Sequence, residues 1–240
     1  MTIHNNFRDI QEYIASIPSL FEKGEGDVIY KGRNELRSFK YQGKEFIVKS
    51  FKRPNLINRF IYGTLRPSKA KRAYENAVKL QELGIGTPVP VGYINKRSFF
   101  LFDKSYLITL KSECPHVYIE LFKKEFKDEE QVMREIGRIT AIMHNNGYAH
   151  KDYGWGNILF SASPDNVKIE LVDLNRMYIG KIDIKMGCRN FERLPCSAQM
   201  HQWLAEEYAK WRNMETEKCL KYIKYYRSLQ PLIKEEKIKK

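Results

Sequence analysis

The chain has 240 residues, of which 42% are hydrophobic and 30% are charged, and its formal net charge is +13. This composition is typical of a folded globular protein, and the length suffices for one large domain or two small lobes. No apolar run reaches the ~18 residues of a membrane span, the polar N-terminus does not resemble a signal peptide, and the four cysteines have no zinc-finger spacing, so we expect a cytoplasmic protein with reduced thiols.

Strands dominate the elements predicted in the first half of the chain. Residues 27–51 contain strand-forming segments separated by Gly32-Arg33-Asn34 and by a Gln-Gly turn. Residues 68–83 form a predicted helix, because Ser68 is a good N-cap, apolar residues recur at spacings of three and four, and Gly84 ends the pattern. Three further strands are expected at residues 89–94, 98–102 and 106–110.

Helices dominate the second half. The longest is predicted at residues 128–146, where an apolar stripe precedes Gly147 as a stop signal. Two short apolar runs follow, at 158–160 and 167–172, and then two helices at about 197–212 and 215–229. The order of elements predicts an α+β chain of two lobes, with a β-rich N-lobe over residues 1–110 and a mainly helical C-lobe over residues 111–240.

Positive charge is concentrated in residues 31–79. This segment holds 14 Lys and Arg against three acidic residues, a net of +11, whereas the rest of the chain carries only +2. Such a concentration indicates a polyanionic partner, namely nucleic acid, an anionic membrane surface or a phosphorylated substrate, or else a solvated basic face. No RNP-like, zinc-finger or basic-zipper motif is present, so nucleic acid is not the expected partner.

The segment HKDYGWGNILF (150–160) is the most informative motif. A histidine stands two residues before Asp152, and Asn157 stands five residues after it, which is the spacing of a kinase catalytic loop. In that loop the aspartate accepts the proton of the acceptor hydroxyl and the asparagine helps to hold a metal ion. The alternative is an aspartate in an ordinary turn followed by a capping asparagine.

A second carboxylate follows in the order that this chemistry requires. Asp173 ends the apolar run of residues 169–172 and lies 21 residues after Asp152. A carboxylate at a strand end beside the first loop suits Mg²⁺, which prefers one or two carboxylates together with phosphate oxygens. An aspartate in a turn after a strand is the simpler interpretation.

A third feature of a kinase site, a lysine with a partner glutamate, lies upstream in the segment of concentrated charge. Lys49 interrupts an otherwise apolar predicted strand, where an ammonium group is costly to bury unless an anion meets it. Glu75 lies within the basic helix that follows, whose one other acid, Glu82, stands at its end, and a Lys on a strand paired with a Glu on the next helix aims the ammonium group at nucleotide phosphates. The alternative is a surface lysine and a solvated glutamate.

The chain resembles the lipopolysaccharide inner-core sugar kinases, the Kdo/heptose kinase family, over residues 27–195. The resemblance is carried by YKGRNELRSF (30–39), FIVKSFK (46–52), IYGTLRPSKAKRAYENA (61–77), GIGTPVPVGY (84–93), HKDYGWGNILF (150–160), LVDLNRM (171–177) and NFERL (190–194). It implies a two-lobed protein-kinase-like fold and transfer of the ATP γ-phosphate to a sugar hydroxyl. The implied acceptor is a lipid A glycolipid, with Kdo favoured over heptose.

The resemblance also implies a role for each candidate residue. Lys49 would hold phosphates, Glu75 would pair with it, Asp152 would be the general base, and Asn157 and Asp173 would bind Mg²⁺. No glycine-rich G-x-G-x-x-G loop is present, and the turn at Gly32, Arg33 and Asn34 takes the place of the loop that covers the phosphates.

Three expectations complete the interpretation. Asp173 is followed by Leu-Asn rather than Phe-Gly, and no Ala-Pro-Glu follows, so we expect a small-molecule or glycolipid acceptor instead of a protein. A glycolipid acceptor and the basic segment together predict a peripheral position at the inner face of the cytoplasmic membrane. The open alternatives are another small-molecule phosphotransferase of this fold and a pseudokinase, although the latter is expected to lack one of the catalytic parts.

Overall fold

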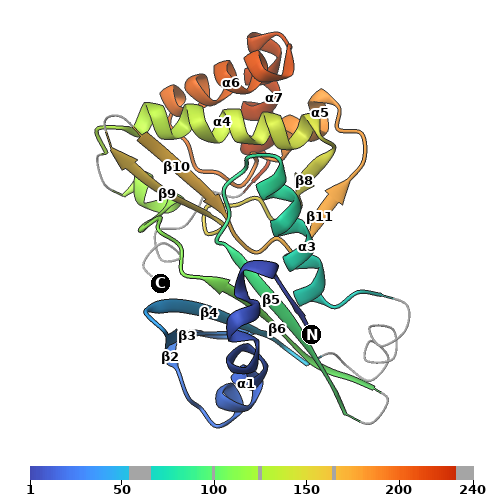
Figure 1. The fold of residues 1–240 in the computed structure, drawn as a ribbon. Helices are drawn as coiled ribbons and strands as arrows, with labels where there is room; N and C mark the ends of the chain where they lie inside the picture. The colour runs from blue at the N-terminus through green and yellow to red at the C-terminus, as the bar shows by residue number, and fades with distance from the viewer. Residues whose placement is uncertain (54–65, 99–100, 124–125, 164–165, 231–240) are drawn as a thin grey trace. The chain divides into compact units, whose positions relative to one another are not determined.

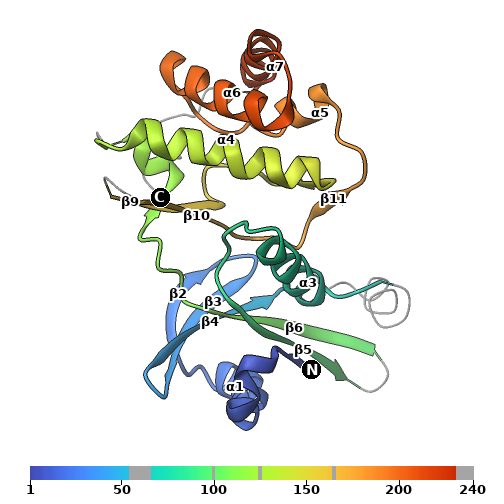
Figure 2. The same ribbon diagram turned by 45° about the horizontal axis from the view of Figure 1, so that its top comes forward.

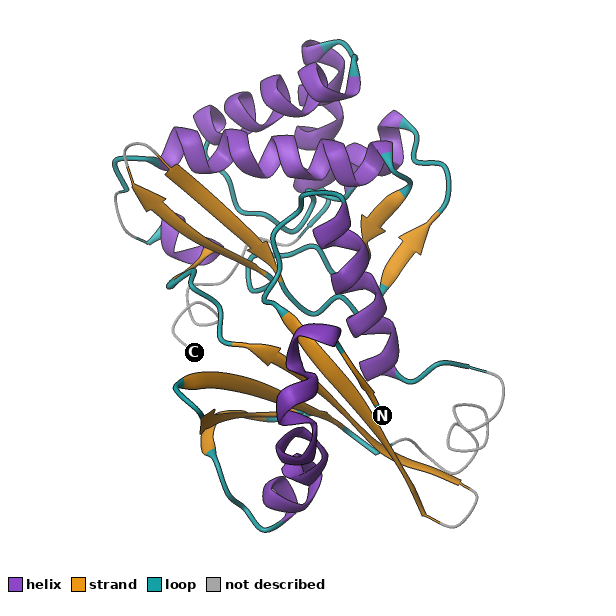
Figure 3. Cartoon of the chain, viewed as in Figure 1, coloured by secondary structure: helices purple, strands orange, loops and turns teal. Residues whose placement is uncertain are grey.

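The computed structural model describes residues 1–53, 66–98, 101–123, 126–163 and 166–230 (Figure 1). The chain divides into two compact units, one of residues 1–79 and 88–112 and the other of residues 80–87 and 113–240. Strands dominate the first unit and helices the second (Figure 3), so the predicted α+β class with a β-rich first part and a helical second part is confirmed.

A six-stranded antiparallel sheet forms the first unit, in the order β1-β5-β6-β4-β3-β2. Its strands are β1 (Thr2–Ile3), β2 (Asp27–Lys31), β3 (Glu35–Tyr41), β4 (Lys44–Phe51), β5 (Pro90–Ser98) and β6 (Leu101–Leu110). The predicted division of residues 98–110 into two strands is wrong. β6 is continuous because it is paired on one side with β4 and on the other with β5, which overrides the polar interruption at Asp103 and Lys104.

One face of this sheet is covered by the N-terminal segment, in which the sequence analysis identified no helix. A 3-10 helix (Asn5–Ile10) leads into α1 (Gln11–Glu22). Apolar residues of the two helices form one core with the sheet, among them Phe7, Ile14 and Phe21 against Phe46 and Val48. Burying this face stabilises the sheet and leaves the opposite face for other contacts.

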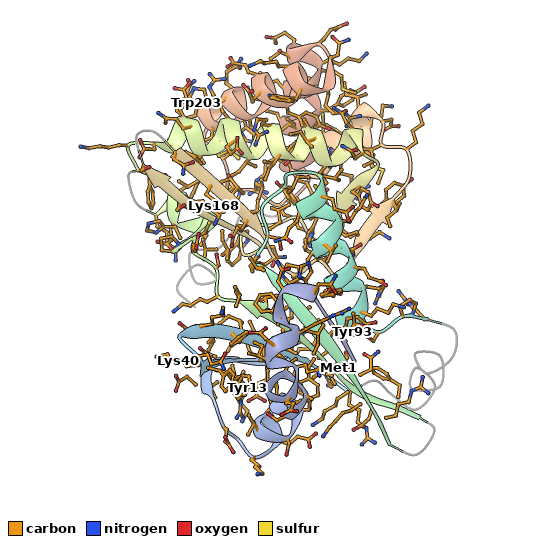
Figure 4. The ribbon with its side chains drawn as sticks, in the orientation of Figure 1. Met1, Tyr13, Lys40, Tyr93, Lys168 and Trp203 are labelled. Carbon is orange, nitrogen blue, oxygen red and sulfur yellow. The ribbon has the colours of Figure 1, made fainter. Side chains whose placement is uncertain are left out.

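Helix α3 (Lys69–Glu82) lies on that opposite face, as Figure 2 shows for α1 and α3. Its start is as predicted, since Ser68 Oγ accepts the N–H of Lys71 at 3.0 Å. The ring of Tyr74 packs 5.5 Å from the ring of Tyr93, which is labelled on β5 in Figure 4. Cross-strand pairing places Lys49 opposite Leu107 and Leu107 opposite Tyr93, so the Lys49 side chain shares the face that α3 covers.

The second unit packs helices against short strands. Its helices are a 3-10 helix (Tyr118–Phe122), α4 (Glu129–Asn145), α5 (Ile184–Arg189), α6 (Ala198–Arg212) and α7 (Thr216–Ser228). The predicted apolar stripe of α4 is buried, and Gly137 lets α6 approach, because a Cβ at this position would lie 2.8 Å from the Leu204 carbonyl oxygen. Among the described residues, no helix combines the length and the apolar character needed to cross a membrane.

Two small sheets of this unit position the loop that contains Asp152. Strands β9 (Ile158–Ser163) and β10 (Asn166–Leu171) form a hairpin, with β7 (His116–Val117) on the other side of β9. Strand β8 (Tyr148–His150) pairs with β11 (Met177–Ile179). The loop between β8 and β9 therefore starts and ends in hydrogen-bonded strands, and β10 ends beside the start of β9 because Leu171 pairs with Ile158.

Candidate active site

His150 organises the loop that carries Asp152. Its ring is fully buried, its Nδ1 accepts the backbone N–H of Asp152 at 3.0 Å, and its Nε2 donates to the carbonyl oxygen of Val172 at 3.1 Å. Burial lowers the pKa of His150, which keeps the ring neutral and able to make both contacts. One side chain thus fixes the backbone of Asp152 relative to the segment that leads into Asp173.

Further hydrogen bonds hold the loop from its other side. Asn157 Nδ2 donates to the Asp152 carbonyl oxygen at 2.8 Å. The backbone N–H of Asn157 donates to the carbonyl oxygen of Gly154, also at 2.8 Å. The hydroxyl of Tyr153, which is buried, lies 2.7 Å from Thr140 Oγ1 on α4. These contacts hold the loop in one conformation, as a site for a positioned base requires.

Asn157 and Asp173 lie together, although they are 16 positions apart in the chain. The N–H of Val172 donates to the carbonyl oxygen of Asn157 at 3.0 Å, which brings the next residue, Asp173, beside the loop. Asp173 has a φ of +60°, in the left-handed region that non-glycine residues rarely adopt, and its Oδ1 accepts from Asn175 Nδ2 at 2.5 Å. Strain of this kind persists where the surrounding structure enforces it, often at functional sites.

The donor set of these residues fits Mg²⁺. Mg²⁺ prefers hard oxygen ligands and takes only one or two carboxylates when substrate phosphates supply the rest. The amide nitrogen of Asn157 is already used within the loop, so its Oδ1 is the atom left to face a cation. Within the described part of the chain there is no group of three or more His, Cys, Asp or Glu that could hold a metal ion.

Two arginines contact the carboxylate of Asp152. Arg176 Nη1 lies 3.2 Å from Oδ1 and 3.1 Å from Oδ2, and Arg193 Nη1 lies 3.6 Å from Oδ1. The backbones of both arginines are joined to the same loop. The Lys151 N–H donates to the Arg176 carbonyl oxygen at 2.9 Å, and Gly154 forms a β-bridge with Arg193.

A chain of buried and half-buried hydrogen bonds connects this loop to α4 and α6. Asn190 Nδ2 donates to the His150 carbonyl oxygen at 2.7 Å, so Asn190 Oδ1 must accept from His144 Nε2, 3.0 Å away. His144 Nδ1 then accepts from the Tyr208 hydroxyl at 2.8 Å, and Arg212 Nη1 donates to the same hydroxyl at 2.8 Å. Each donor in this chain points from Arg212 towards the loop that contains Asp152, and this direction fixes the tautomer of His144.

The candidate residues of the first unit lie on one side of its sheet. Lys49 Nζ lies 5.4 Å from the centre of the Phe51 ring, and Glu75 is on α3, which covers the same face. Glu75 makes an ion pair of 3.6 Å with Lys71, one turn earlier in the helix. Its pairing with Lys49 stays a prediction.

The turn at Gly32, Arg33 and Asn34 joins β2 and β3, as the sequence indicated. Gly32 N–H donates to the Asn34 carbonyl oxygen at 3.0 Å, and Asn34 Oδ1 accepts the backbone N–H of Lys52 at 3.2 Å. The second contact attaches the turn to the end of β4, the strand that carries Lys49. Its role in covering phosphates stays a prediction.

Three residues of the site were not singled out in the sequence analysis, namely Arg176, Asn190 and Arg193. Their roles depend on contacts over 24, 40 and 41 positions of sequence, which spacing rules do not detect. All three nevertheless fall within LVDLNRM (171–177) and NFERL (190–194), which contribute to the family resemblance. The presence of these polar residues in segments that carry the resemblance was the one signal in the sequence that could have identified them.

The fold and the second unit's loop together define a protein-kinase-like protein, and comparisons with solved structures agree. The chain matches "WaaP in complex with acyl carrier protein" with a TM-score of 0.63 and 14% identity, covering 95% of this chain and 94% of that one. It matches the Rio2 kinase–ADP/Mg²⁺–phosphoaspartate complex from Chaetomium thermophilum with a TM-score of 0.50 and 12% identity. This match covers 88% of the present chain and 66% of the Rio2 chain. It matches WbdD with a TM-score of 0.51 and 14% identity, and the match covers 85% of the present chain and 46% of the WbdD chain.

The family itself is shown by sequence. The model of the lipopolysaccharide kinase (Kdo/WaaP) family matches residues 24–214, and the chain belongs to this family. It is therefore an ATP-dependent phosphotransferase that acts on a sugar hydroxyl in lipopolysaccharide biosynthesis. A comparison with curated protein sequences found no match.

Proposed function

We propose that this kinase transfers the γ-phosphoryl group of ATP to a hydroxyl of Kdo in the inner core of lipid A-linked lipopolysaccharide. The observation that carries the proposal is the loop of residues 150–157, in which His150 and Asn157 both bind the backbone of Asp152. These contacts restrict the backbone of Asp152, which supports a role for its carboxylate as a general base for an acceptor hydroxyl. Membership of the Kdo/WaaP family supports a sugar of lipopolysaccharide as the acceptor.

The proposed mechanism assigns one task to each candidate residue. Asp152 accepts the proton of the sugar hydroxyl as its oxygen attacks the γ-phosphorus of ATP, and ADP leaves. Asn157 and Asp173 would hold Mg²⁺, which when bound neutralises charge on the phosphate oxygens. Lys49 positions the phosphates, Glu75 orients Lys49, and the turn of Gly32, Arg33 and Asn34 covers the phosphates in place of a glycine-rich loop.

We also propose where the protein acts. A lipid A acceptor is embedded in a membrane, and the +11 segment of residues 31–79 would attract anionic headgroups at the inner face of the cytoplasmic membrane. Part of this charge has an internal role, because Arg37 is buried and binds Glu35 at 2.6 Å. Exposed basic residues of the segment, such as Lys52 and Arg66, support a peripheral position.

Incubation with ATP, Mg²⁺ and Kdo-bearing lipid A, followed by mass spectrometry, tests the function. We expect one added phosphate, and fragmentation that places it on Kdo. Kdo-free lipid A should gain none, and a deacylated acceptor shows whether the acyl chains are needed. Phosphate on a heptose-bearing acceptor but never on Kdo would keep the enzyme class and overturn the choice of sugar.

A further inference from the structure

The two arginines at Asp152 have no role in the mechanism above. We propose that Arg176 and Arg193 form a binding site for an anionic group of the acceptor, a carboxylate or a phosphate that lies next to the hydroxyl to be phosphorylated. This inference rests on the proposed function and names the acceptor chemistry that the same site selects.

The first argument is how the arginines are attached. Arg176 follows β10 and Arg193 follows α5, yet each is joined through its backbone to the catalytic loop, at Lys151 and at Gly154. Asp152 lies between these two anchoring points. Any group held by the guanidinium of Arg176 therefore lies within a few ångströms of the position where Asp152 receives a hydroxyl.

The second argument is the balance of charge. Two guanidinium groups contact one carboxylate, so the cluster keeps an excess of positive charge even with Asp152 ionised. The side chains of Arg176 and Arg193 are 60% and 52% exposed, so both remain open to a solute. Guanidinium groups bind carboxylates and phosphates through paired N–H donors, which a neutral sugar hydroxyl cannot match.

The third argument is what the base needs. In the protein alone, Arg176 Nη1 lies within hydrogen-bonding distance of both oxygens of Asp152, the oxygens that must receive the acceptor hydroxyl. An acceptor that brings its own anion can take over the guanidinium groups and leave the Asp152 oxygens to its hydroxyl. A neutral acceptor has no anion to replace Asp152 as the partner of the arginines, so the arrangement selects for anionic acceptors.

The test compares charged and neutralised acceptors in variants of the full chain. The variants are Arg176→Gln and Arg193→Gln, and the matched control is Arg189→Gln. Arg189 is an exposed arginine of α5 that pairs with Glu192 at 3.2 Å, so its substitution makes the same change in charge. The acceptors are Kdo-lipid A, its Kdo methyl ester, and Kdo-lipid A without the lipid A phosphates, which separates the two sources of anion.

For the wild type we expect kcat/KM to fall about 10- to 100-fold when the recognised anion is removed, as for loss of a charge-assisted hydrogen bond. Arg176→Gln and Arg193→Gln should show a similar loss with the intact acceptor and no further loss when that anion is removed. The KM for ATP should stay near the wild-type value, and Arg189→Gln should behave as the wild type. Equal losses on charged and neutralised acceptors would overturn the proposal, since the arginines would then serve Asp152 or the transferred phosphoryl group.

Calorimetric binding of Kdo-lipid A and of its methyl ester and dephosphorylated forms separates this proposal from the proposed function. Weaker binding when one anion is removed, with the difference lost in Arg176→Gln and kept in Arg189→Gln, supports the anion site even if no phosphate is transferred. Transfer by the wild type without any dependence on either anion overturns the anion site and leaves the kinase function intact.

Discussion

At the scale of the single residue, Asp152 combines a fixed backbone with a partly exposed carboxylate. His150 and Asn157 bind its N–H and C=O, and only the side chain is left to interact with a substrate. A restricted backbone favours the role of general base. Less entropy is lost when the acceptor hydroxyl is aligned with a carboxylate whose own backbone is already fixed.

Replacing this carboxylate by an amide should separate chemistry from binding. Asp152→Asn should lower kcat by about 10²- to 10⁴-fold, the range for a positioned general base, while the melting temperature and the affinity for ATP change little. Steady-state kinetics, thermal melting and nucleotide titration measure the three quantities. Turnover at the wild-type rate would remove Asp152 from the mechanism.

The proposed Lys49–Glu75 pair can be tested against the pair that the structure contains. Lys49→Ala should raise the KM for ATP and lower kcat, and Glu75→Ala should reproduce part of that loss, because the ammonium group would no longer be oriented. Lys71→Ala is the matched control, since it removes the observed partner of Glu75 without touching the proposed one. If Glu75→Ala were silent while Lys49→Ala were inactive, the proposed pair would be wrong.

His144 makes the stability of the protein sensitive to acid. Burial lowers its pKa to about 3, whereas in the unfolded chain the ordinary value of about 6.5 applies. Its contribution to the free energy of unfolding is complete above about pH 6.5 and is lost as the pH falls towards 3, by up to about 1.4 kcal/mol per pH unit. Burial also lowers the pKa values of His150 and His201, which adds to the effect.

Urea unfolding at about pH 7.5 and about pH 5.5 measures this dependence. His144→Gln should lose less stability on acidification than the wild type, because glutamine can still accept from Tyr208 and donate to Asn190 but does not titrate in this range. An unchanged pH dependence in the variant would show that His144 is not the group responsible.

At the scale of the element, a glycine determines how closely one segment approaches the strand before Asp173. A Cβ on Gly86 would collide with the carbonyl oxygen of Ile169, and the Leu171 N–H donates to the Gly86 carbonyl oxygen at 2.9 Å. The segment of residues 84–87 is therefore attached to β10 by its backbone.

Gly86→Ala should lower the free energy of unfolding by about 1–3 kcal/mol, the usual cost of forcing extra atoms into a packed site. Denaturant unfolding gives the value. Gly156→Ala is the matched control for stability, since a Cβ there meets no atom within 4 Å. A loss in Gly86→Ala no larger than in the control would show that β10 can shift without cost.

The sequence predicted some elements better than others, for physical reasons. Helices α3 and α4 have regular apolar spacing and glycine stops, and both were predicted within a few residues. Helix α1 was missed because its signal is interrupted by Pro18, and its stability comes from packing on the sheet. Strands β8 and β11 have three residues each, too few to show any period, yet they support the loop that contains Asp152.

The same contrast applies to the site. Asp152 and Asn157 could be proposed from spacing, because a loop motif is local in sequence. Arg176, Asn190 and Arg193 could not, because their contacts form only when strands and helices distant in sequence have come together. Local motifs therefore identify the reaction, and the tertiary contacts decide how its parts are held.

At the scale of the whole molecule, the remaining question is what the basic segment of residues 31–79 binds. The candidates in this segment for contact with the acceptor or the membrane are Arg53, Arg59, Arg66, Lys69, Lys71 and Arg72. Of these, Arg59 lies outside the described residues, and Lys71 pairs with Glu75. Arg53 pairs with Asp103, but its side chain is 51% exposed, and an ion pair this exposed contributes little to stability.

The variant that tests this surface replaces Arg53, Arg66 and Lys69 together by glutamate and keeps Lys71, so that the helix retains its ion pair. Each basic residue near an anionic surface contributes about 1 kcal/mol, and the attraction decays within about 8 Å at physiological salt. The triple reversal should therefore raise the KM for a vesicle-embedded lipid acceptor by at least about tenfold and weaken its dependence on salt. The KM for ATP should not change.

The control reverses Lys218, Lys221 and Lys224 on α7, three exposed lysines whose replacement makes the same change in net charge. A loss confined to the first variant would mean that residues 31–79 face the membrane, because net charge alone is matched between the two. An equal rise in the KM for the lipid acceptor in both variants would assign the effect to the net charge of +13. That charge would then attract anionic surfaces without one particular side of the protein facing the membrane. A change in the KM for ATP with unchanged use of lipid would instead place this charge at the nucleotide, and the membrane-facing role would be wrong.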